Sequence, residues 1–505
     1  MPSHPADNPD RFPPNLPQPR YDRSAVSVGI VHFGVGGFHR AHQATYLDSL
    51  MNEGAAMDWG ICGVGVMPSD GAMARALIPQ NGLYTLVVKH PDGRLEPRVI
   101  GSIVEYLYAP DDPDLVLERL TAEQTRIVSL TITEGGYNFN QATREFIADE
   151  PDVAADLLPA ATPSTVFGYV VEALDRRRRR GIAPFTVMSC DNIQSNGHVA
   201  REMFTAFAAL RDPGLAQWMS EHVHFPDSMV DRITPVTTDD DRAQLRDRLG
   251  VADSWPVICE PFTQWVLQDD FGLGRPPLER AGVQLVDDVT PYELMKLRLL
   301  NAGHQAIAYF GHLLGHRYVH EAATDPRLVS YVRAYMDAEA TPTLLPVPGI
   351  DLDAYKSELL RRFANPGIRD TVARLCAESS DRIPKWVLPV IRQNLATNGP
   401  ISHATAIVAS WARYAEGVDE QGEPIEVVDR LADEVSAAAR QYPSDPLALI
   451  KLTDLFGDLA EDDRFAEQYL RIARSIHTVG VAETLAQLGT LDVASAPVRP
   501  IITQW

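Results

Sequence analysis

The apolar residues of this chain change their spacing near residue 290, and this change constrains the fold more than any other feature. Upstream, short apolar runs of strand type alternate with segments of helical spacing. The strand-type runs are 26–34, 59–66, 84–88, 125–133 and 184–190, and the helical segments include 38–51, 166–174 and 198–210. Strands that alternate with helices predict a mainly parallel sheet covered on both faces.

Downstream, almost every segment has a period of about 3.6 residues. The predicted helices are 292–300, 327–336, 355–364, 370–378, 384–395, 403–415 and 465–476. The chain is therefore divided into a proline-rich arm (1–25), a Rossmann-type α/β domain (26–288) that ends in a strand near 283–289, and an all-α domain (289–505). The polar, proline-rich composition of the arm predicts a disordered segment.

Composition excludes several classes of protein. The net charge of −23 over 505 residues argues against nucleic-acid binding, which needs surplus cations. The basic run Arg176–Arg180 is interpreted as the C-terminal end of a helix, where cations are favourable. The four cysteines lie far apart, and neither a signal peptide nor an apolar run of membrane-spanning length is present. A cytoplasmic enzyme that acts on a small molecule and has no membrane partner is expected.

The turn Gly34-Val35-Gly36-Gly37-Phe38 is the predicted cofactor-binding segment. Gly34 and Gly36 match the first two glycines of the dinucleotide fingerprint, which give a tight turn and close approach of the backbone to pyrophosphate. The third position is His39 instead of glycine, so the following helix must pack differently on the strand. A structural glycine turn without a nucleotide is the alternative.

Asp70 follows the second predicted strand and is the acidic residue nearest to its end. A carboxylate there binds the ribose hydroxyls of NAD and repels the extra phosphate of NADP. It would serve equally well as the cap of a helix over 71–78. Both interpretations stay open.

The segment YELMKLRLLNAGH (292–304) places three polar groups on an apolar helix. With about 100° per residue, Lys296, His304 and Asn301 fall at roughly 0°, 80° and 140° around the axis. A desolvated lysine is a suitable general base, and an amide can donate to a developing alkoxide. A solvated polar stripe is the alternative.

Two other motifs in this region are not followed further. Tyr292 and Lys296 match the Y-x-x-x-K pair of short-chain dehydrogenases, but those chains are about half as long and space the glycine turn differently. The histidines 304, 312, 316 and 320 have no H-E-x-x-H motif, and Gly311 and Gly315 interrupt them. No catalytic metal is predicted.

The motifs GVGGFHRAH, SLTITEGGY, SCDN, MVDRITP, EPFTQWVLQDDF and YELMKLRLLNAGH together resemble the long-chain, zinc-independent mannitol dehydrogenase family. The similarity extends from Gly29 to about Trp411. It implies a Rossmann-type domain joined to a helical domain, with the active site in the cleft, NAD as cofactor, and a monomer.

The resemblance also implies roles for individual residues. Lys296 would be the general base, Asn192 and Asn301 would form an oxyanion hole, and His304 would position the substrate. Glu134 would lie on a water path between the lysine and solvent.

Three further residues are carried over to the substrate hydroxyls: Asp231, Arg374 and Lys385. Asp231 and Arg374 are alternatively a buried ion pair, and Lys385 a surface residue.

The implied reaction is reversible oxidation of D-mannitol to D-fructose. The alternatives are a fructuronate or tagaturonate reductase, another pentitol or hexitol dehydrogenase of the same family, and a non-catalytic NAD-binding regulator.

Overall fold

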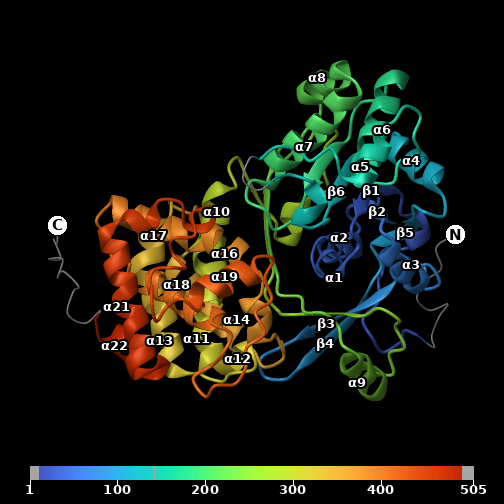
Figure 1. Ribbon diagram of the computed structural model, residues 1–505. Helices are drawn as coiled ribbons and strands as arrows, with labels where there is room; N and C mark the ends of the chain where they lie inside the picture. Colours follow the sequence, from blue (N-terminus) through green and yellow to red (C-terminus); the bar gives the residue numbers. More distant parts are fainter. Residues whose placement is uncertain (1–10, 141–143, 492–505) are drawn as a thin grey trace, which may run out of the picture. The chain divides into compact units, whose positions relative to one another are not determined.

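The computed structural model describes residues 11–140 and 144–491 (Figure 1). The chain divides into two compact units, Met1–Thr290 and Pro291–Trp505. All the named strands belong to the first unit, whereas the described residues of the second form helices and loops. No helix within the described ranges is long and apolar enough to cross a membrane.

The central sheet of the first unit has five parallel strands in the order β5-β2-β1-β6-β7. They are β1 (Val28–Phe33), β2 (Gly60–Gly65), β5 (Ile103–Tyr108), β6 (Ile127–Leu130) and β7 (Thr186–Ser189). Four of them lie in predicted runs and confirm the parallel α/β fold. The fifth, β5, was not predicted. It is a half-buried edge strand and so lacks a continuous apolar run.

Helices cover both faces of this sheet. Successive side chains of β1 point to opposite faces, so they pack into two different cores. Val31 and Phe33 pack into a core with helices α4 (Pro113–Thr121), α5 (Pro151–Asp156), α6 (Val166–Arg180), α7 (Asn196–Arg211) and α8 (Pro213–His222). Ile30 packs into a second core with α2 (Gln43–Asn52) and α3 (Gly71–Leu77). A doubly covered parallel sheet places the carboxyl ends of its strands along one edge, where such folds bind ligands.

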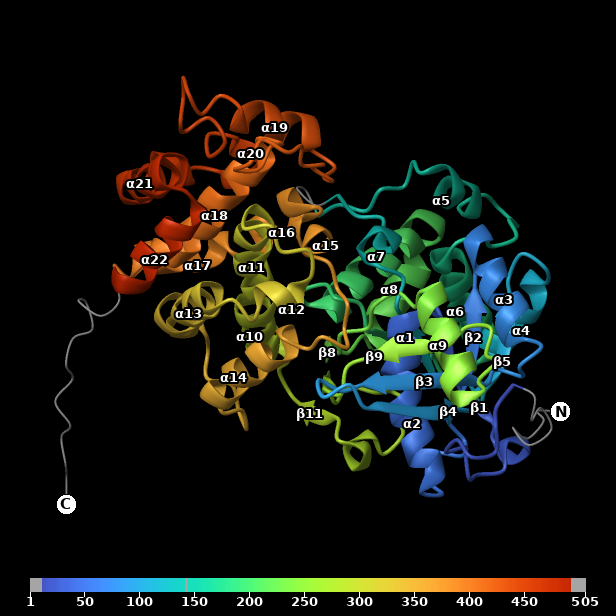
Figure 2. The same ribbon diagram turned by 90° about the horizontal axis from the view of Figure 1, so that it is seen from below.

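Two small sheets complete the first unit. One contains β3 (Tyr84–Lys89), β4 (Leu95–Ile100) and β9 (Val257–Cys259), and the other contains β8 (Ser228–Asp231), β10 (Gln264–Gln268) and β11 (Gln284–Val286). The prediction that 84–88 continues the parallel sheet is wrong, because β3 pairs with β4 as an antiparallel hairpin and with β9. Helix α9 (Asp239–Leu249) lies beside this hairpin in Figure 2.

Residues 11–25 of the N-terminal segment pack against the rest of the first unit. Phe12 and Leu16 join an apolar cluster with Val87 and Leu245. The buried guanidinium of Arg23 donates to the carbonyl oxygens of Gly101, Asn81 and Ile103. The prediction of a disordered arm is therefore wrong for residues 11–25, where a few large apolar side chains outweigh the polar composition. Residues 1–10 lie outside the described residues.

The basic run ends α6, as predicted, because Gly181 caps the helix with φ +69°. Arg177 differs from the other arginines of this run, because it does not lie in solvent. Its side chain is fully buried and donates to the carbonyl oxygens of Ala183, Leu120, Ala122 and Thr125.

The second unit is an assembly of helices in which α18 (Ser402–Ala415) lies against α11 (Ala302–Leu313) and α21 (Asp463–Val479) (Figure 2). Every predicted helical segment overlaps an observed helix, although 384–395 is divided into two at Val387. The longer helices are α11 (Ala302–Leu313), α13 (Pro326–Ala334), α14 (Leu352–Phe363), α16 (Ser379–Trp386), α17 (Leu388–Ala396), α19 (Ala432–Ala439), α21 (Asp463–Val479) and α22 (Val481–Leu491). Shorter ones are α10 (Thr290–Met295), α12 (Val319–Ala322), α15 (Val372–Cys376) and α20 (Thr453–Phe456).

Candidate active site

The glycine turn lies at the carboxyl end of β1. Gly34 has φ +88°, and an added Cβ would lie 2.1 Å from the carbonyl oxygen of Thr131, so only glycine fits. A Cβ on exposed Gly36 would meet no atom closer than 3.8 Å. The backbone at Gly36 therefore offers the open approach that a pyrophosphate needs, and these residues fit a dinucleotide.

The rest of the turn serves packing. Val35 is buried against the sheet, and the half-buried Phe38 ring stacks on His42 with centroids 4.9 Å apart. The single helix expected over 38–51 is broken at His42 into α1 (Gly37–Ala41) and α2.

His39 replaces the third glycine by stacking on a strand residue. Its ring lies 3.4 Å from the ring of His32, with 14° between the planes, and both side chains are buried. Burial lowers the pKa of His32 to about 3 and holds the pKa of His39 well below its ordinary value, so both imidazoles are neutral. The helix thus packs differently, as predicted from the missing glycine.

Asp70 lies at the carboxyl end of β2. Its Oδ2 accepts the amide hydrogens of Val66 (3.0 Å) and Met67 (2.9 Å). Its side chain makes no capping bond to α3, so the alternative interpretation as the cap of 71–78 is wrong. The carboxylate stabilises the turn after β2, next to the glycine turn after β1.

The loops after β6 and β7 carry Glu134 and Asn192. Glu134 begins a short 3-10 helix, Glu134–Tyr137, and is half-buried, whereas Asn192 is exposed in the loop before α7. Strands β6 and β7 are parallel neighbours, so both loops leave the same edge of the sheet. Asp191, which sequence reasoning missed, connects these two loops by hydrogen bonds. Its signal in the sequence was an acid directly after a buried strand.

Asp231 ends β8 and is buried. The adjacent Arg232 donates to the carbonyl oxygens of Ala41 (2.6 Å) and Glu260 (3.0 Å). The motif MVDRITP thus connects Asp231 to the end of α1, which follows the glycine turn.

Lys296 and Asn301 begin and end a π-helical turn, Lys296–Asn301, inserted between α10 and α11. The angles expected from a regular α-helix are therefore wrong for this segment, because a π turn closes with i→i+5 bonds. Such turns are frequent at functional sites, and the periodicity of the apolar residues does not reveal them.

Both side chains of the π turn are buried. Lys296 is 7% exposed and Asn301 is 5% exposed, so the interpretation as a solvated polar stripe is wrong. Among the described residues, Asn301 Nδ2 has no hydrogen-bond partner. Because a buried amide donor is costly when unsatisfied, this atom indicates a site for an acceptor oxygen. His304, half-buried on α11, packs its ring on Phe363 with centroids 4.2 Å apart.

Arg374 and Lys385 are exposed. Arg374, on α15, forms a bidentate ion pair with Asp370, and these hydrogen bonds raise its pKa. Lys385 lies near the end of α16.

The histidines after His304 lie on separate segments. His312 is in α11, His316 pairs with Asp325 at 3.3 Å, and His320 stacks on Tyr318. Within the described residues, no group of three or more His, Cys, Asp or Glu side chains is arranged to hold a metal ion.

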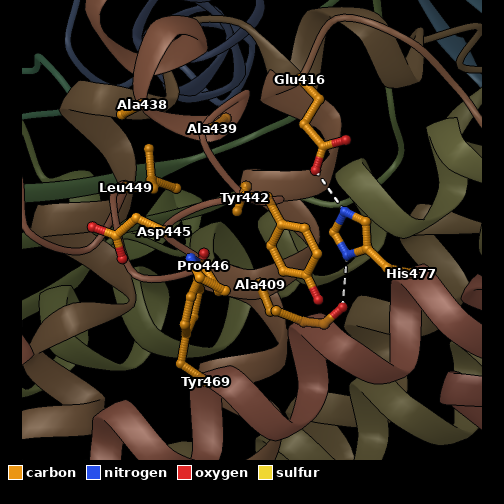
Figure 3. Close-up of a pocket in the computed structure, with 12 residues that line it drawn as sticks. Ala409, Glu416, Ala438, Ala439, Tyr442, Asp445, Pro446, Leu449, Tyr469 and His477 are labelled. Carbon is orange, nitrogen blue, oxygen red and sulfur yellow. Dashed lines mark hydrogen bonds and ion pairs between the residues drawn. The ribbon is translucent and has the colours of Figure 1, made fainter.

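A small pocket lies between α18, α19 and α21 (Figure 3). His477 there faces Glu416 at 2.7 Å and the Ala473 carbonyl at 2.7 Å, and its ring stacks on Tyr442. None of the predicted catalytic residues lines this pocket. Both nitrogens of His477 have partners, which indicates a structural cluster.

A Rossmann-type sheet with an open glycine turn, together with a helical unit that carries a buried lysine and an unsatisfied amide, defines a dinucleotide-dependent oxidoreductase. Two family models match the chain: the mannitol dehydrogenase Rossmann domain over residues 28–280 and the mannitol dehydrogenase C-terminal domain over residues 288–477. The chain belongs to the mannitol dehydrogenase family.

Named relatives agree with this assignment. Mannitol 2-dehydrogenase of Neosartorya fischeri is 45% identical over 474 residues, which are 92% of this chain and 94% of that protein. Mannitol dehydrogenase 2 of Saccharomyces cerevisiae is 45% identical over 470 residues, 93% of each chain.

Two solved structures are also similar. The ternary complex of Pseudomonas fluorescens mannitol 2-dehydrogenase with NAD and D-mannitol has a TM-score of 0.84 and 44% identity, covering 94% of this chain and 97% of that one. A D-sorbitol dehydrogenase in substrate-free form has a TM-score of 0.87 and 38% identity, covering 96% of this chain and all of the other.

Proposed function

We propose that this protein is an NAD-dependent polyol dehydrogenase that interconverts D-mannitol and D-fructose without a catalytic metal. The observation that carries the proposal is the buried Asn301 amide, a donor without a partner among the described residues, on the same π turn as buried Lys296. Support comes from relatives named mannitol 2-dehydrogenase and from the similar enzyme solved with NAD and D-mannitol.

The cofactor is held by the turn Gly34–Phe38 and by Asp70. The open backbone at Gly36 receives the pyrophosphate, and Asp70 accepts hydrogen bonds from the adenosine ribose, which favours NAD over NADP. When bound, NAD⁺ supplies the acceptor for the hydride that leaves the carbinol carbon.

The protein's own groups handle the proton and the oxygen. Lys296 Nζ, in its neutral form, takes the proton from the C2 hydroxyl. The amides of Asn192 and Asn301 donate to the same oxygen as it becomes a carbonyl, and His304 orients the substrate. Glu134 passes the proton between Lys296 and solvent.

The direction of the reaction sets its pH dependence. Oxidation needs the neutral amine of Lys296, whereas reduction needs the ammonium as proton donor. Oxidation therefore increases and reduction decreases as pH rises.

Asp231, Arg374 and Lys385 complete the substrate site. The charge of the Arg374 guanidinium is balanced by the carboxylate of Asp370 in a bidentate pair, which weakens its attraction for a substrate carboxylate. This pairing favours an uncharged polyol over the sugar acid of a fructuronate or tagaturonate reductase.

D-Sorbitol is the second candidate substrate, since the D-sorbitol dehydrogenase structure is also similar. It differs from D-mannitol in the configuration at one carbon, which catalytic motifs do not select. We further propose that residues 26–288 and 289–505 act as the cofactor and catalytic domains of a cytoplasmic monomer.

The test is a panel of NAD-linked assays on purified protein. D-Fructose and D-fructuronate are tried with NADH, and D-mannitol and D-sorbitol with NAD⁺. Turnover of D-fructose and D-mannitol is expected. Turnover of fructuronate alone would indicate the sugar-acid reductase, faster turnover of D-sorbitol the second candidate, and NADH binding without turnover the regulatory protein.

A further inference from the structure

The carboxylate of Asp191 is buried between the loops that follow β6 and β7. It accepts the amide hydrogens of Ile132 (3.1 Å) and Thr133 (2.8 Å) and the hydroxyl hydrogen of Tyr137 (2.8 Å). All three donors belong to the TITEGGY segment that carries Glu134. Asp191 itself precedes Asn192 directly, so one carboxylate connects the two proposed catalytic residues of this unit.

The backbone at Thr133 needs such a partner. Thr133 has φ +63° and ψ 168°, a region that is nearly confined to glycine. Its amide is bonded to Asp191, and Glu134 is the next residue. Non-glycine residues persist in this conformation only where their surroundings fix them, and functional sites are where they gather.

The second loop is fixed from its other side. Asn196 donates its amide hydrogens to the carbonyl oxygens of Asp191 (2.9 Å) and Ser228 (2.8 Å), and it accepts from the Ser228 amide. Tyr137 also bonds Ser189, at the end of β7, at 2.6 Å. Asp191 is thus held by its main chain, and its carboxylate determines where the Glu134 loop lies.

We propose that Asp191 is a positioning residue, which holds Thr133 in its positive-φ conformation and thereby fixes Glu134 relative to Asn192. The inference rests on the proposed function, because the role of Glu134 as the proton path belongs to it. Asp191 contacts neither substrate nor cofactor in this account and acts through Glu134.

The test uses Asp191→Asn, Glu134→Gln and the double variant in the D-fructose and NADH assay. Asparagine has the size of aspartate but presents an NH₂ group to one of the two loop amides, so the loop loses a bond. Asp191→Asn is expected to lower kcat by about 10- to 100-fold and to leave the KM for NADH within about twofold, because misplacement by about an ångström has costs of this size. In the Glu134→Gln background the same change is expected to have little further effect.

Asp227→Asn is the matched control. Asp227 accepts the amides of Gly197 (2.7 Å) and His198 (3.2 Å) at the start of α7, and it does not bond the Glu134 loop. The kcat of the Asp227→Asn variant should stay within about twofold of the wild-type value. Hydrogen exchange gives a second readout: amides of residues 131–138 should exchange faster in Asp191→Asn than in Asp227→Asn.

Tyr137→Phe covers the case in which Asp191→Asn does not fold. It keeps the carboxylate and both backbone bonds, so a smaller loss of kcat is expected, again absent in the Glu134→Gln background. Unchanged kcat, or losses that multiply with those of Glu134→Gln, would overturn the positioning role while leaving the proposed function intact. A wild-type protein without turnover would overturn the proposed function and this inference with it.

Discussion

Asp70 has a structural role in the protein and, in the proposed function, a role in the choice of cofactor. Its Oδ2 is engaged by the amides of Val66 and Met67, which fixes the carboxylate at the end of β2. A negative charge there disfavours the additional phosphate of NADP by electrostatic repulsion. The sequence offered Asp70 both as a helix cap and as a ribose partner; the structure excludes the cap of 71–78, and the ribose contact is a proposal.

Asp70→Asn is therefore expected to shift the ratio of kcat/KM for NADH to that for NADPH towards NADPH by about tenfold or more, since one charge contact is worth about 1.4 kcal/mol. Asparagine retains the side-chain oxygen that supports the turn. Steady-state kinetics with both cofactors measures the ratio. An unchanged ratio would remove Asp70 from the cofactor site.

The stacked pair His32 and His39 makes the sheet unit sensitive to acid. The pKa of each imidazole is lowered in the folded protein, so below pH 6.5 the unfolded chain binds protons that the folded chain excludes. Their stabilising contribution is complete above that pH. It is lost as the pH falls, by up to about 1.4 kcal/mol per unit for each residue.

His39→Phe tests this dependence, because neither nitrogen of His39 has a hydrogen-bond partner among the described residues. The ring also borders a small pocket lined mainly by apolar side chains, among them Ile30, Leu47 and Met188, which are suitable neighbours for a phenyl group. Denaturant unfolding between about pH 7.5 and 5 should show a shallower decline in the free energy of unfolding for the variant. Parallel declines would contradict the neutral, buried state of His39.

The π turn of Lys296–Asn301 is an element that the sequence did not reveal. Apolar periodicity placed a helix correctly over 292–300, but it assumed regular α geometry. A residue outside the turn stabilises it: the Tyr335 hydroxyl donates a hydrogen bond to the carbonyl oxygen of Arg298 at 3.1 Å. Contacts of this kind come from tertiary packing, and the local spacing of apolar residues does not predict them.

Tyr335→Phe should therefore lower both stability and activity. The lost bond is expected to reduce the free energy of unfolding by about 1 kcal/mol and, by letting the turn relax, to lower kcat by about tenfold. Tyr331→Phe is the matched control, because the buried Tyr331 hydroxyl donates to the His403 carbonyl at 2.7 Å, away from the π turn. Equal effects of the two variants on kcat would show that the turn does not depend on Tyr335.

For the whole molecule, the sequence predicted the order of an α/β unit and a helical unit, and the candidate residues on both. Strands Ser228–Asp231 and Val257–Cys259 were missed because neither lies in a longer apolar run: Asp227 precedes the first, and Pro256 and Glu260 flank the second. Residues 11–25 were misjudged because composition averages over a segment, whereas packing depends on a few side chains such as Phe12 and Leu16. The two loops joined by Asp191 were likewise invisible, since their contacts link residues about 60 positions apart.

The packed N-terminal segment gives a prediction for the stability of the sheet unit. Phe12, 1% exposed, fills a cluster with Val87 and Leu245, so Phe12→Ala should lower the free energy of unfolding by about 3 to 5 kcal/mol. Leu158→Ala, at a side chain that is 62% exposed, should change it by less than about 0.5 kcal/mol. Denaturant unfolding measures both, and a Phe12→Ala protein as stable as wild type would mean that the segment does not pack in solution.

Chemical rescue can establish whether Lys296 is the proton acceptor of an NAD-linked polyol oxidation. Lys296→Ala should lower kcat for D-mannitol with NAD⁺ by about 100-fold or more, the usual contribution of a general base. Added methylamine should restore part of that rate in proportion to its neutral form, and it should leave the wild type and Asn301→Ala unchanged. We expect methylamine to restore activity in Lys296→Ala alone. An alanine variant that keeps its rate, or one whose lost rate no amine restores, would contradict the assignment of Lys296 as the base.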